Sequence, residues 1–280
     1  MRFRSLLFAP AVRADFIAKL AGRGADAVAI DCEDAAPANA KAEARAAAAE
    51  HAPALAAAGC ATFTRINPPG TEWFADDVAG GLVPELAGVI VPMVETIDGL
   101  DLVGAALDTA GLTELAILAG IETGLGVADS RAVLDHPRVM AAYFGAEDYI
   151  ADLGGVRTAA NTEVLYARSQ VVLAGRLAQV PVLDMVTTDF NNDERFTAEA
   201  ADARTLGFAG KLCIHPRQVT LANAAFVPSE AEVAAAQRML AAYDEACANG
   251  LSAIAVDGQM VDEPLAVQAR QILALATEGS

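Results

Sequence analysis

The chain has 280 residues, of which 37 are acidic and 19 are basic, so its formal net charge at neutral pH is −18. A hydrophobic content of 54% excludes an intrinsically disordered chain and provides apolar side chains for one large domain or two small ones. The negative charge repels nucleic-acid phosphates and anionic lipid heads, and no stripe of lysine and arginine reverses it locally. Neither nucleic acid nor a membrane is therefore expected as a partner.

The cellular setting follows from the cysteines and from the first residues. The four cysteines stand far apart without a Cys-x-x-Cys pair, which indicates neither a disulfide framework nor a zinc site. An apolar run over residues 5–12 follows two arginines, but it contains Pro10 and is followed at once by Arg13 and Asp15. This favours a buried strand over a secretion signal. We expect a cytoplasmic protein without a transmembrane helix.

Eight short apolar runs are predicted to form β-strands. They lack an alternation of apolar and polar side chains, which is typical of parallel strands buried on both faces. In chain order the runs are Ser5–Ala11, Ala27–Asp34, Ala61–Asn67, Ala87–Val94, Glu114–Thr123, Val139–Asp148, Pro181–Thr187 and Gly210–Pro216.

Alanine-rich stretches between these runs are compatible with amphipathic helices. They are Arg13–Arg23, Asn39–Ala49, Ile97–Thr109, Thr162–Ala178 and Arg195–Leu206. A repeated strand and helix predicts an α/β fold, a (β/α)8 TIM barrel. An open doubly wound sheet is the alternative, but the Gly-x-Gly-x-x-Gly turn expected after its first strand is absent.

The end of the chain does not continue this repeat. A helix is predicted over Ser229–Ala248 with Ser229 as its N-cap, Ala253–Val261 is ambiguous, and Glu263–Thr277 is helical again. The segment is too small for an independent core and too apolar to remain exposed, so we expect it to pack on the barrel or on a neighbouring subunit. The predicted domains are a catalytic barrel, residues 1–228, and a C-terminal helical extension, residues 229–280.

Polar side chains at the C-terminal ends of the predicted strands are the candidates for chemistry, because reactive groups of such barrels lie there. They are Asp31, Glu33, Asp34, Arg65, Asn67, Glu95, Glu122, Glu147, Asp148, Asp184 and His215. So many acids at one mouth repel one another, and a divalent cation with oxygen ligands, Mg²⁺, relieves that repulsion. The alternative for some of these acids, Asp34 and Glu95 first, is that they cap the following helices.

Several segments, in this order along the chain, carry a resemblance to a known family. They are Leu7–Pro10, Asp31–Ala35 with Lys41 and Arg45, Arg65–Asn67, Ile121–Gly124, Gly145–Asp148 with Asp152–Gly154, Cys213–Pro216 and Gly258–Pro264. Together they resemble the HpcH/HpaI aldolase and citrate lyase beta-subunit superfamily, in particular its stand-alone, citrate lyase beta-like CoA-ester lyases.

The resemblance implies a Mg²⁺-dependent carbon–carbon lyase. Its substrate would be a 3-hydroxyacyl-CoA such as citryl-, malyl- or citramalyl-CoA, cleaved to or formed from acetyl-CoA and oxaloacetate, glyoxylate or pyruvate. A malyl-CoA-type thioesterase, a class II aldolase acting on free hydroxy-diacids, and a catalytically inert subunit that binds CoA metabolites are the alternatives. Pro92-Met93-Val94-Glu95 stands where many relatives have Pro-Lys-x-Glu, which leaves the acyl preference open.

The resemblance also implies roles for individual residues. Glu122 and Asp148 would be the two carboxylate ligands of Mg²⁺, and Arg65 would stabilise the enolate. Asp262 would be the acid and base, supplied by a neighbouring subunit of an oligomer that is commonly a trimer. Judged from the residues alone, Arg65 could instead pair with Asp31 or Glu33, and Asp262 could be a helix N-cap.

Substrate contacts are the last group of candidates. Besides Arg65, the acids Glu33 and Glu147 at the same mouth are candidates for binding substrate. The phosphates of CoA need cations, and eight of the 19 basic residues lie in the first 65 positions, whereas residues 66–130 contain none. The candidates for contacts with CoA are Arg13, Lys19, Lys41 and Arg45. A surface charge without a ligand is the alternative for each of these four.

Overall fold

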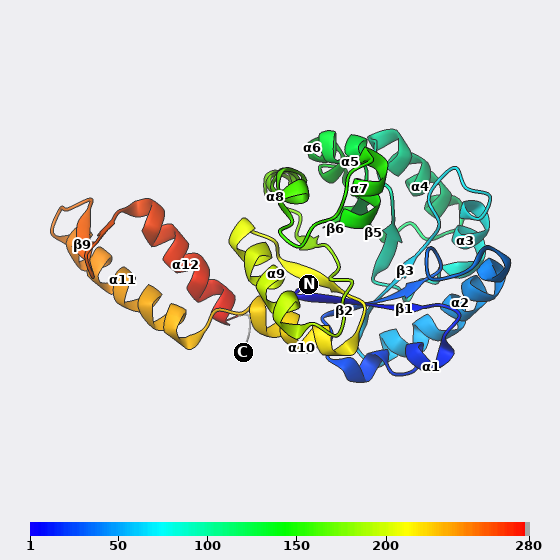
Figure 1. The fold of residues 1–280 in the computed structure, drawn as a ribbon, viewed down its shortest axis with the longest axis horizontal. Helices are drawn as coiled ribbons and strands as arrows, with labels where there is room; N and C mark the ends of the chain where they lie inside the picture. The colour runs from blue at the N-terminus through cyan, green and yellow to red at the C-terminus, as the bar shows by residue number, and fades with distance from the viewer. Residues whose placement is uncertain (278–280) are drawn as a thin grey trace. The chain divides into compact units, whose positions relative to one another are not determined.

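The computed structural model describes residues 1–277 and confirms the predicted α/β TIM barrel (Figure 1). Eight parallel strands lie side by side in chain order, and pairing of the first with the last closes the barrel. The strands are β1 (Ser5–Pro10), β2 (Ala27–Asp31), β3 (Ala61–Arg65), β4 (Gly88–Val91), β5 (Ala116–Ile121), β6 (Val139–Phe144), β7 (Val182–Asp184) and β8 (Gly210–Cys213).

Helices surround the strands on the outside of the barrel (Figure 1). They are α1 (Ala14–Ile17), η1 (Leu20–Arg23), η2 (Ala38–Ala40), α2 (Lys41–Ala57), α3 (Phe74–Gly81), α4 (Ile97–Thr109), α5 (Gly124–Ala128), α6 (Ser130–Leu134), α7 (Ala146–Leu153), η3 (Thr162–Val164), α8 (Leu165–Ala178), α9 (Asp193–Leu206) and α10 (Pro216–Ala225). Among the described residues, no helix combines the length and the apolar character that a membrane span needs.

Each predicted strand exists, but its C-terminal end lies earlier than the apolar pattern indicates. The largest correction concerns Val139–Asp148, because β6 ends at Phe144 and α7 begins at Ala146. Glu147 and Asp148 therefore lie in the first turn of a helix, where acidic side chains interact favourably with the helix dipole. After β4, Thr96 and not Glu95 caps α4, since the Thr96 hydroxyl accepts a hydrogen bond from the Gly99 N–H.

The interior of the barrel is a packed core and not a channel. Phe3, Phe63, Ile90, Leu118 and Leu183 belong to one cluster of buried side chains contributed by most of the strands. Interdigitated layers of this kind are the usual filling of TIM barrels. The floor of any site at the C-terminal end of the barrel is therefore rigid and apolar.

A buried ion cluster joins the last strands to the helices outside them. Both guanidinium arms of Arg168 in α8 donate to the carboxylate of Asp184 at 2.9 Å, and the Lys211 ammonium donates to the same carboxylate at 3.2 Å. Lys211 also lies 3.5 Å from Glu199 of α9. Asp184 is fully buried in this cluster, which corrects the expectation that it faces the mouth of the barrel.

The described chain divides into two compact units, Met1–Asn223 and a second one that begins at Ala224. The second contains α11 (Glu230–Ala248), β9 (Ile254–Val256), β10 (Gln259–Val261) and α12 (Glu263–Thr277). Ser229 caps α11 as predicted, in a reciprocal capping box with Glu232.

The ambiguous segment of this second unit is a β-hairpin. Strands β9 and β10 are antiparallel, and Asp257 and Gly258 between them both have positive φ, 51° and 80°. An Asp-Gly pair in this conformation is the preferred two-residue hairpin turn. Against expectation, the unit has a small apolar cluster of its own, in which Tyr243, Val261 and Ala266 are buried.

Replacing Lys211 by methionine tests the buried ion cluster. The variant keeps the length of the side chain but leaves Asp184 and Glu199 with one cation fewer in the protein interior. Breaking a buried ion pair costs about 3–5 kcal/mol, so we expect Lys211→Met to lower the free energy of unfolding in urea by about that amount. The matched control is Lys19→Met at an exposed position, which should leave the urea midpoint unchanged. Equal midpoints for both variants would contradict the assigned role.

Candidate functional site

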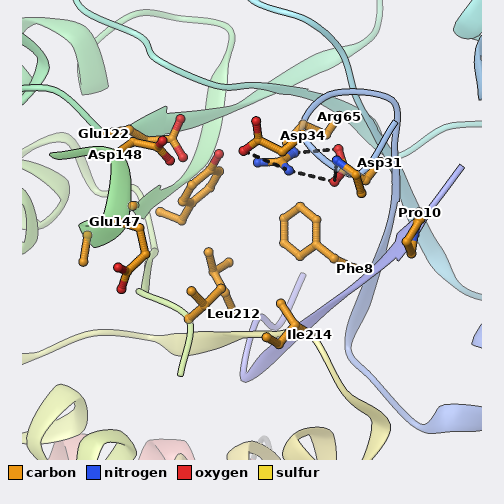
Figure 2. A pocket seen from close by; sticks show the side chains of 15 residues that line it. Phe8, Pro10, Asp31, Asp34, Arg65, Glu122, Glu147, Asp148, Leu212 and Ile214 are labelled. Carbon is orange, nitrogen blue, oxygen red and sulfur yellow. Dashed lines mark hydrogen bonds and ion pairs between the residues drawn. The ribbon is translucent and has the colours of Figure 1, made fainter. Parts of the chain in front are cut away.

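A pocket of about 350 Å³ opens where the C-terminal ends of the barrel strands meet (Figure 2). Its wall includes Asp31 and Arg65, which end β2 and β3, and Glu122, which follows β5. A second hollow of about 400 Å³ shares Asp34, Glu122 and Asp148 with the first. The carboxylates of Glu122 and Asp148 therefore lie where the two hollows adjoin, so a ligand in either of them meets this pair.

The guanidinium of Arg65 is the positive charge around which the acids of the pocket are arranged. Because Arg65 and Asp31 are neighbours in the β2–β3 register, the guanidinium forks onto the Asp31 carboxylate with hydrogen bonds of 2.8 and 2.7 Å (Figure 2). A third nitrogen lies 3.2 Å from Glu33. Arg65 is thus paired with both Asp31 and Glu33, the two partners expected from the sequence. Burial lowers the pKa of Arg65, but the negative charges of Asp31 and Glu33 have the larger effect. Together they raise the pKa of Arg65 well above its ordinary value.

Glu122 is held deep in the wall of the pocket, with its side chain only 3% exposed. One of its oxygens accepts a hydrogen bond of 2.8 Å from the backbone N–H of Met93. Met93 has a φ of 54°, a left-handed conformation that is rare for a residue with a long side chain. Burial raises the pKa of Glu122 to about 7; the charge of Asp148 acts in the same direction and Arg65 opposes both.

Asp148 faces the same space from the first turn of α7 (Figure 2). Burial is the main cause that raises its pKa, and the charge of Asp34 adds to it. Within residues 1–277, neither Asp148 nor Glu122 has an ion-pair partner closer than 4 Å. Two carboxylates therefore share one partly desolvated space without a protein cation bound to either.

This donor set fits Mg²⁺. The described part of the chain contains no group of three or more His, Cys, Asp or Glu arranged around a common metal position. Mg²⁺ does not need one, since it usually binds one or two carboxylates and keeps water or substrate oxygens in its other positions. Glu122 and Asp148 are the residues that would hold it, because a cation between them offsets the desolvation that raises both pKa values.

The other two acids proposed for substrate binding already have basic partners. Glu33 lines the second hollow and lies against Arg65, and burial raises its pKa to about 7. Glu147 lines the first pocket and accepts a hydrogen bond of 3.0 Å from Arg157. Their place at the mouth agrees with the sequence-based expectation, and their role in binding substrate stays a prediction.

The four cations proposed for CoA fall into two groups. Lys41 is buried, and its ammonium donates to the carbonyls of Cys32 and Glu33 and to the Asn67 side chain at 3.1, 2.7 and 2.7 Å. These three acceptors use its three N–H donors, and Lys41 also lines the second hollow, so its contact with CoA stays a prediction.

Arg45 is likewise used inside the protein, with a hydrogen bond of 3.0 Å to the buried Asp77 carboxylate. Arg13 and Lys19 are exposed, and Arg13 forks onto its neighbour Asp15 at 2.8 and 2.9 Å. Contacts of these two with CoA remain a prediction.

Asp262 belongs to the second compact unit, between β10 and α12. Its backbone carbonyl accepts a hydrogen bond from the Ala266 N–H at 3.0 Å, as at the start of a helix. One of its carboxylate oxygens is buried, and it has no hydrogen-bond partner among the described residues. A capping bond from that oxygen is therefore not formed, and its role as acid and base stays a prediction.

Two contributors to the site escaped the sequence analysis. Tyr143 on β6 lines the first pocket, yet it lies inside an apolar strand and carries no motif. Met93 supplies a backbone N–H that no side-chain pattern reveals. Of the strand-end candidates, Glu95, Asp184 and His215 line neither hollow within the described chain; His215 instead stacks on Phe190 with ring centres 5.5 Å apart.

Comparisons with known proteins agree with this fold and show the family. The sequence profile of the HpcH/HpaI aldolase/citrate lyase family matches residues 4–216. A citrate lyase subunit beta-like protein of Deinococcus radiodurans is 49% identical, with 96% of each chain covered. A (3S)-malyl-CoA thioesterase of Cereibacter sphaeroides is 31% identical over 98% of this chain and 94% of that one. The crystal structure of protein CitE from Mycobacterium tuberculosis in complex with magnesium, acetoacetate and coenzyme A has a TM-score of 0.82 at 31% identity, and the two chains are covered to 99% and 98%.

Replacing Arg65 by lysine tests whether the fork itself matters. Lysine keeps the charge but offers a single nitrogen, so the buried Asp31 carboxylate loses one of its two charged hydrogen bonds. Hydrogen bonds to charged groups contribute about 1.5–3 kcal/mol each, and we expect Arg65→Lys to lower the free energy of unfolding by that amount.

The matched control is Arg13→Lys, because Arg13 forks onto Asp15 with the same geometry at the exposed surface. Urea denaturation of this variant should show no loss. A loss of equal size in both variants would mean that burial of the Arg65 fork is unimportant.

Proposed function

The chain belongs to the HpcH/HpaI aldolase/citrate lyase family, and we propose that it is a Mg²⁺-dependent carbon–carbon lyase acting on a 3-hydroxyacyl-CoA. The products are acetyl-CoA and a 2-oxo acid, or the reverse in the direction of condensation. The observation that carries the proposal is the pair of carboxylates, Glu122 and Asp148, facing a buried arginine at the C-terminal mouth of the barrel (Figure 2).

Mg²⁺ held by Glu122 and Asp148 would supply a Lewis acid that polarises oxygens of the 2-oxo acid. The protein itself contributes a positive charge at Arg65. Cleavage of the carbon–carbon bond leaves negative charge on the thioester oxygen, and a guanidinium already fixed by Asp31 stabilises that charge without reorganising during the reaction. The apolar floor beside it, with Phe8, Leu212 and Ile214, limits the access of water.

The second hollow offers space for the larger part of the substrate. It continues from Glu122 and Asp148 toward Trp73 and Thr71, away from the first pocket. We assign the reacting end of the substrate, with the 2-oxo acid portion and the thioester carbonyl, to the pocket that contains Arg65, and the rest of the CoA chain to the second hollow. The M. tuberculosis structure in complex with acetoacetate and coenzyme A supports a site that accepts both kinds of molecule.

Proton transfer requires a general acid and base beside the substrate hydroxyl. We assign this role to Asp262 of a neighbouring copy of the chain, in an oligomer for which a trimer is favoured. The assignment rests on the resemblance to the family; one oxygen of Asp262 is buried without a hydrogen-bond partner among the described residues, so no structural bond ties that oxygen in place. In the cleavage direction this carboxylate takes the proton of the substrate hydroxyl.

The reaction class can be tested directly. Purified protein is incubated with citryl-, malyl- and citramalyl-CoA, with and without Mg²⁺, and the products are separated by chromatography. We expect acetyl-CoA and a 2-oxo acid to appear only with Mg²⁺. Free CoA with an intact acid would identify a thioesterase, turnover of free hydroxy-diacids alone would identify an aldolase, and no turnover would identify a binding subunit. The relative called citrate lyase subunit beta-like is more similar to this chain than the thioesterase, which favours the lyase.

Asp262→Asn tests the acid and base. General acid–base groups contribute about 100- to 10,000-fold, so kcat for carbon–carbon cleavage should fall by that factor, while binding of Mn²⁺ as a probe should be unchanged. Undiminished turnover would contradict the role. Mixing Asp262→Asn with Glu122→Gln chains then tests the shared site: sites built from two copies should regain activity that neither variant has alone. An inactive mixture that is shown to exchange subunits would place Asp262 elsewhere.

A further inference from the structure

At the base of the pocket, a glycine on one strand leaves room for a side chain of the neighbouring strand. In the register of β5 and β6, Gly120 lies opposite Tyr143. A Cβ atom at Gly120 would lie only 2.6 Å from the Tyr143 hydroxyl and 3.0 Å from the Pro92 Cα. Only glycine at position 120 therefore leaves the phenol ring of Tyr143 the room that it occupies above β5.

The same arrangement recurs two residues later with the roles of the strands reversed. Glu122 follows β5, and Gly145 follows β6. A Cβ atom at Gly145 would lie 2.6 Å from a carboxylate oxygen of Glu122 and 2.7 Å from its Cγ. Glu122 thus extends over β6 while Tyr143 extends over β5, and the two polar ends come together below the mouth.

The Tyr143 hydroxyl is buried at this meeting point. The side chain is 1% exposed and lines the first pocket. Among residues 1–277 no group satisfies full hydrogen-bond geometry with the hydroxyl, although the charged groups beside it are Glu122 and Arg65. A tyrosine hydroxyl is protonated at neutral pH, so the phenol has a proton to donate.

Only one of these two neighbours can receive that proton. A guanidinium has five N–H donors and no acceptor, and Arg65 already directs its nitrogens at Asp31 and Glu33. Glu122 accepts from the Met93 N–H on one oxygen, and its other oxygen is the one beside Gly145. Glu122 is therefore the acceptor that is available to the Tyr143 hydroxyl.

We propose that Tyr143 is a positioning residue, whose hydroxyl donates to Glu122 and, together with the Met93 N–H, holds the carboxylate in the orientation that binds the metal ion. The inference rests on the proposed function, because it takes Glu122 to be a ligand of Mg²⁺. Partners that orient a metal ligand typically change metal affinity by about 10- to 100-fold. Tyr143 makes no contact with the reacting atoms in this role.

Tyr143→Phe tests the proposal, since it removes one oxygen and keeps the ring. Binding of Mn²⁺ to the protein without substrate is measured by electron paramagnetic resonance, and kcat, KM and the thermal midpoint are measured in parallel. We expect Mn²⁺ affinity to fall about 10-fold with an unchanged thermal midpoint, because the cost of burying the hydroxyl offsets the hydrogen bond that it makes to Glu122. The control is Tyr166→Phe, at a residue that is 73% exposed on α8, which should change none of these values.

The outcomes separate the two proposals. If the unaltered protein does not bind Mn²⁺, the proposed metal site fails. If it binds Mn²⁺ and Tyr143→Phe binds it equally well, the positioning role is overturned. Equal Mn²⁺ affinity with a raised KM for the 2-oxo acid also overturns it, because the hydroxyl then contacts substrate. Weaker Mn²⁺ binding together with a lowered thermal midpoint overturns it as well, since general damage to the barrel explains both.

Discussion

The C-terminal end of this barrel depends on one buried positive charge. Arg65 neutralises Asp31 through a two-bonded fork and lies against Glu33. Its charge also lowers the cost of ionising Glu122 and Asp148, although it bonds to neither. One guanidinium cannot compensate all of these acids, because burial strengthens every repulsion between them. The acids of the site are therefore not neutralised by protein cations alone, and the proposed Mg²⁺ would supply the missing positive charge.

The backbone around Glu122 is adapted to hold this one carboxylate. Met93 adopts a left-handed conformation and directs its N–H at the carboxylate, and Gly145 leaves out the Cβ atom that would collide with it. Each feature costs conformational freedom or introduces strain, and such costs persist where the surrounding structure and function require them. Two separate segments, the one with Met93 and the one with Gly145, thus converge on the Glu122 side chain. This convergence distinguishes a built site from a chance cluster of acids at the ends of strands.

Periodicity and turn chemistry were sufficient to predict the barrel, because eight buried strands with helices between them leave few other topologies. The same reasoning placed Glu122 and Arg65 correctly at the mouth. The sequence patterns were misleading where the same residue type can lie either in the pocket or in a buried polar cluster. Asp184 reads as a strand-end acid like Asp31, but Lys211 and Arg168 lie behind it and not in the pocket. Lys41 reads as a free cation, yet two of its three acceptors are backbone carbonyls that no side-chain pattern encodes.

The overall acidity of the chain says little about whether it can bind an anionic thioester. At physiological ionic strength, charges more than about 8 Å apart are largely screened. A ligand therefore interacts mainly with the charged side chains nearest to it and hardly with the net charge of −18. Several of the cations concentrated before residue 66 are used internally, as the pairs of Arg4 with Asp26 and of Arg45 with Asp77 illustrate. Fewer of these basic side chains are therefore available to contact phosphates than their number in the sequence suggests. Under the proposed function, affinity for a CoA thioester would therefore come chiefly from its reacting end, where Arg65 and the proposed metal ligands would meet the acyl group, and only secondarily from the phosphates.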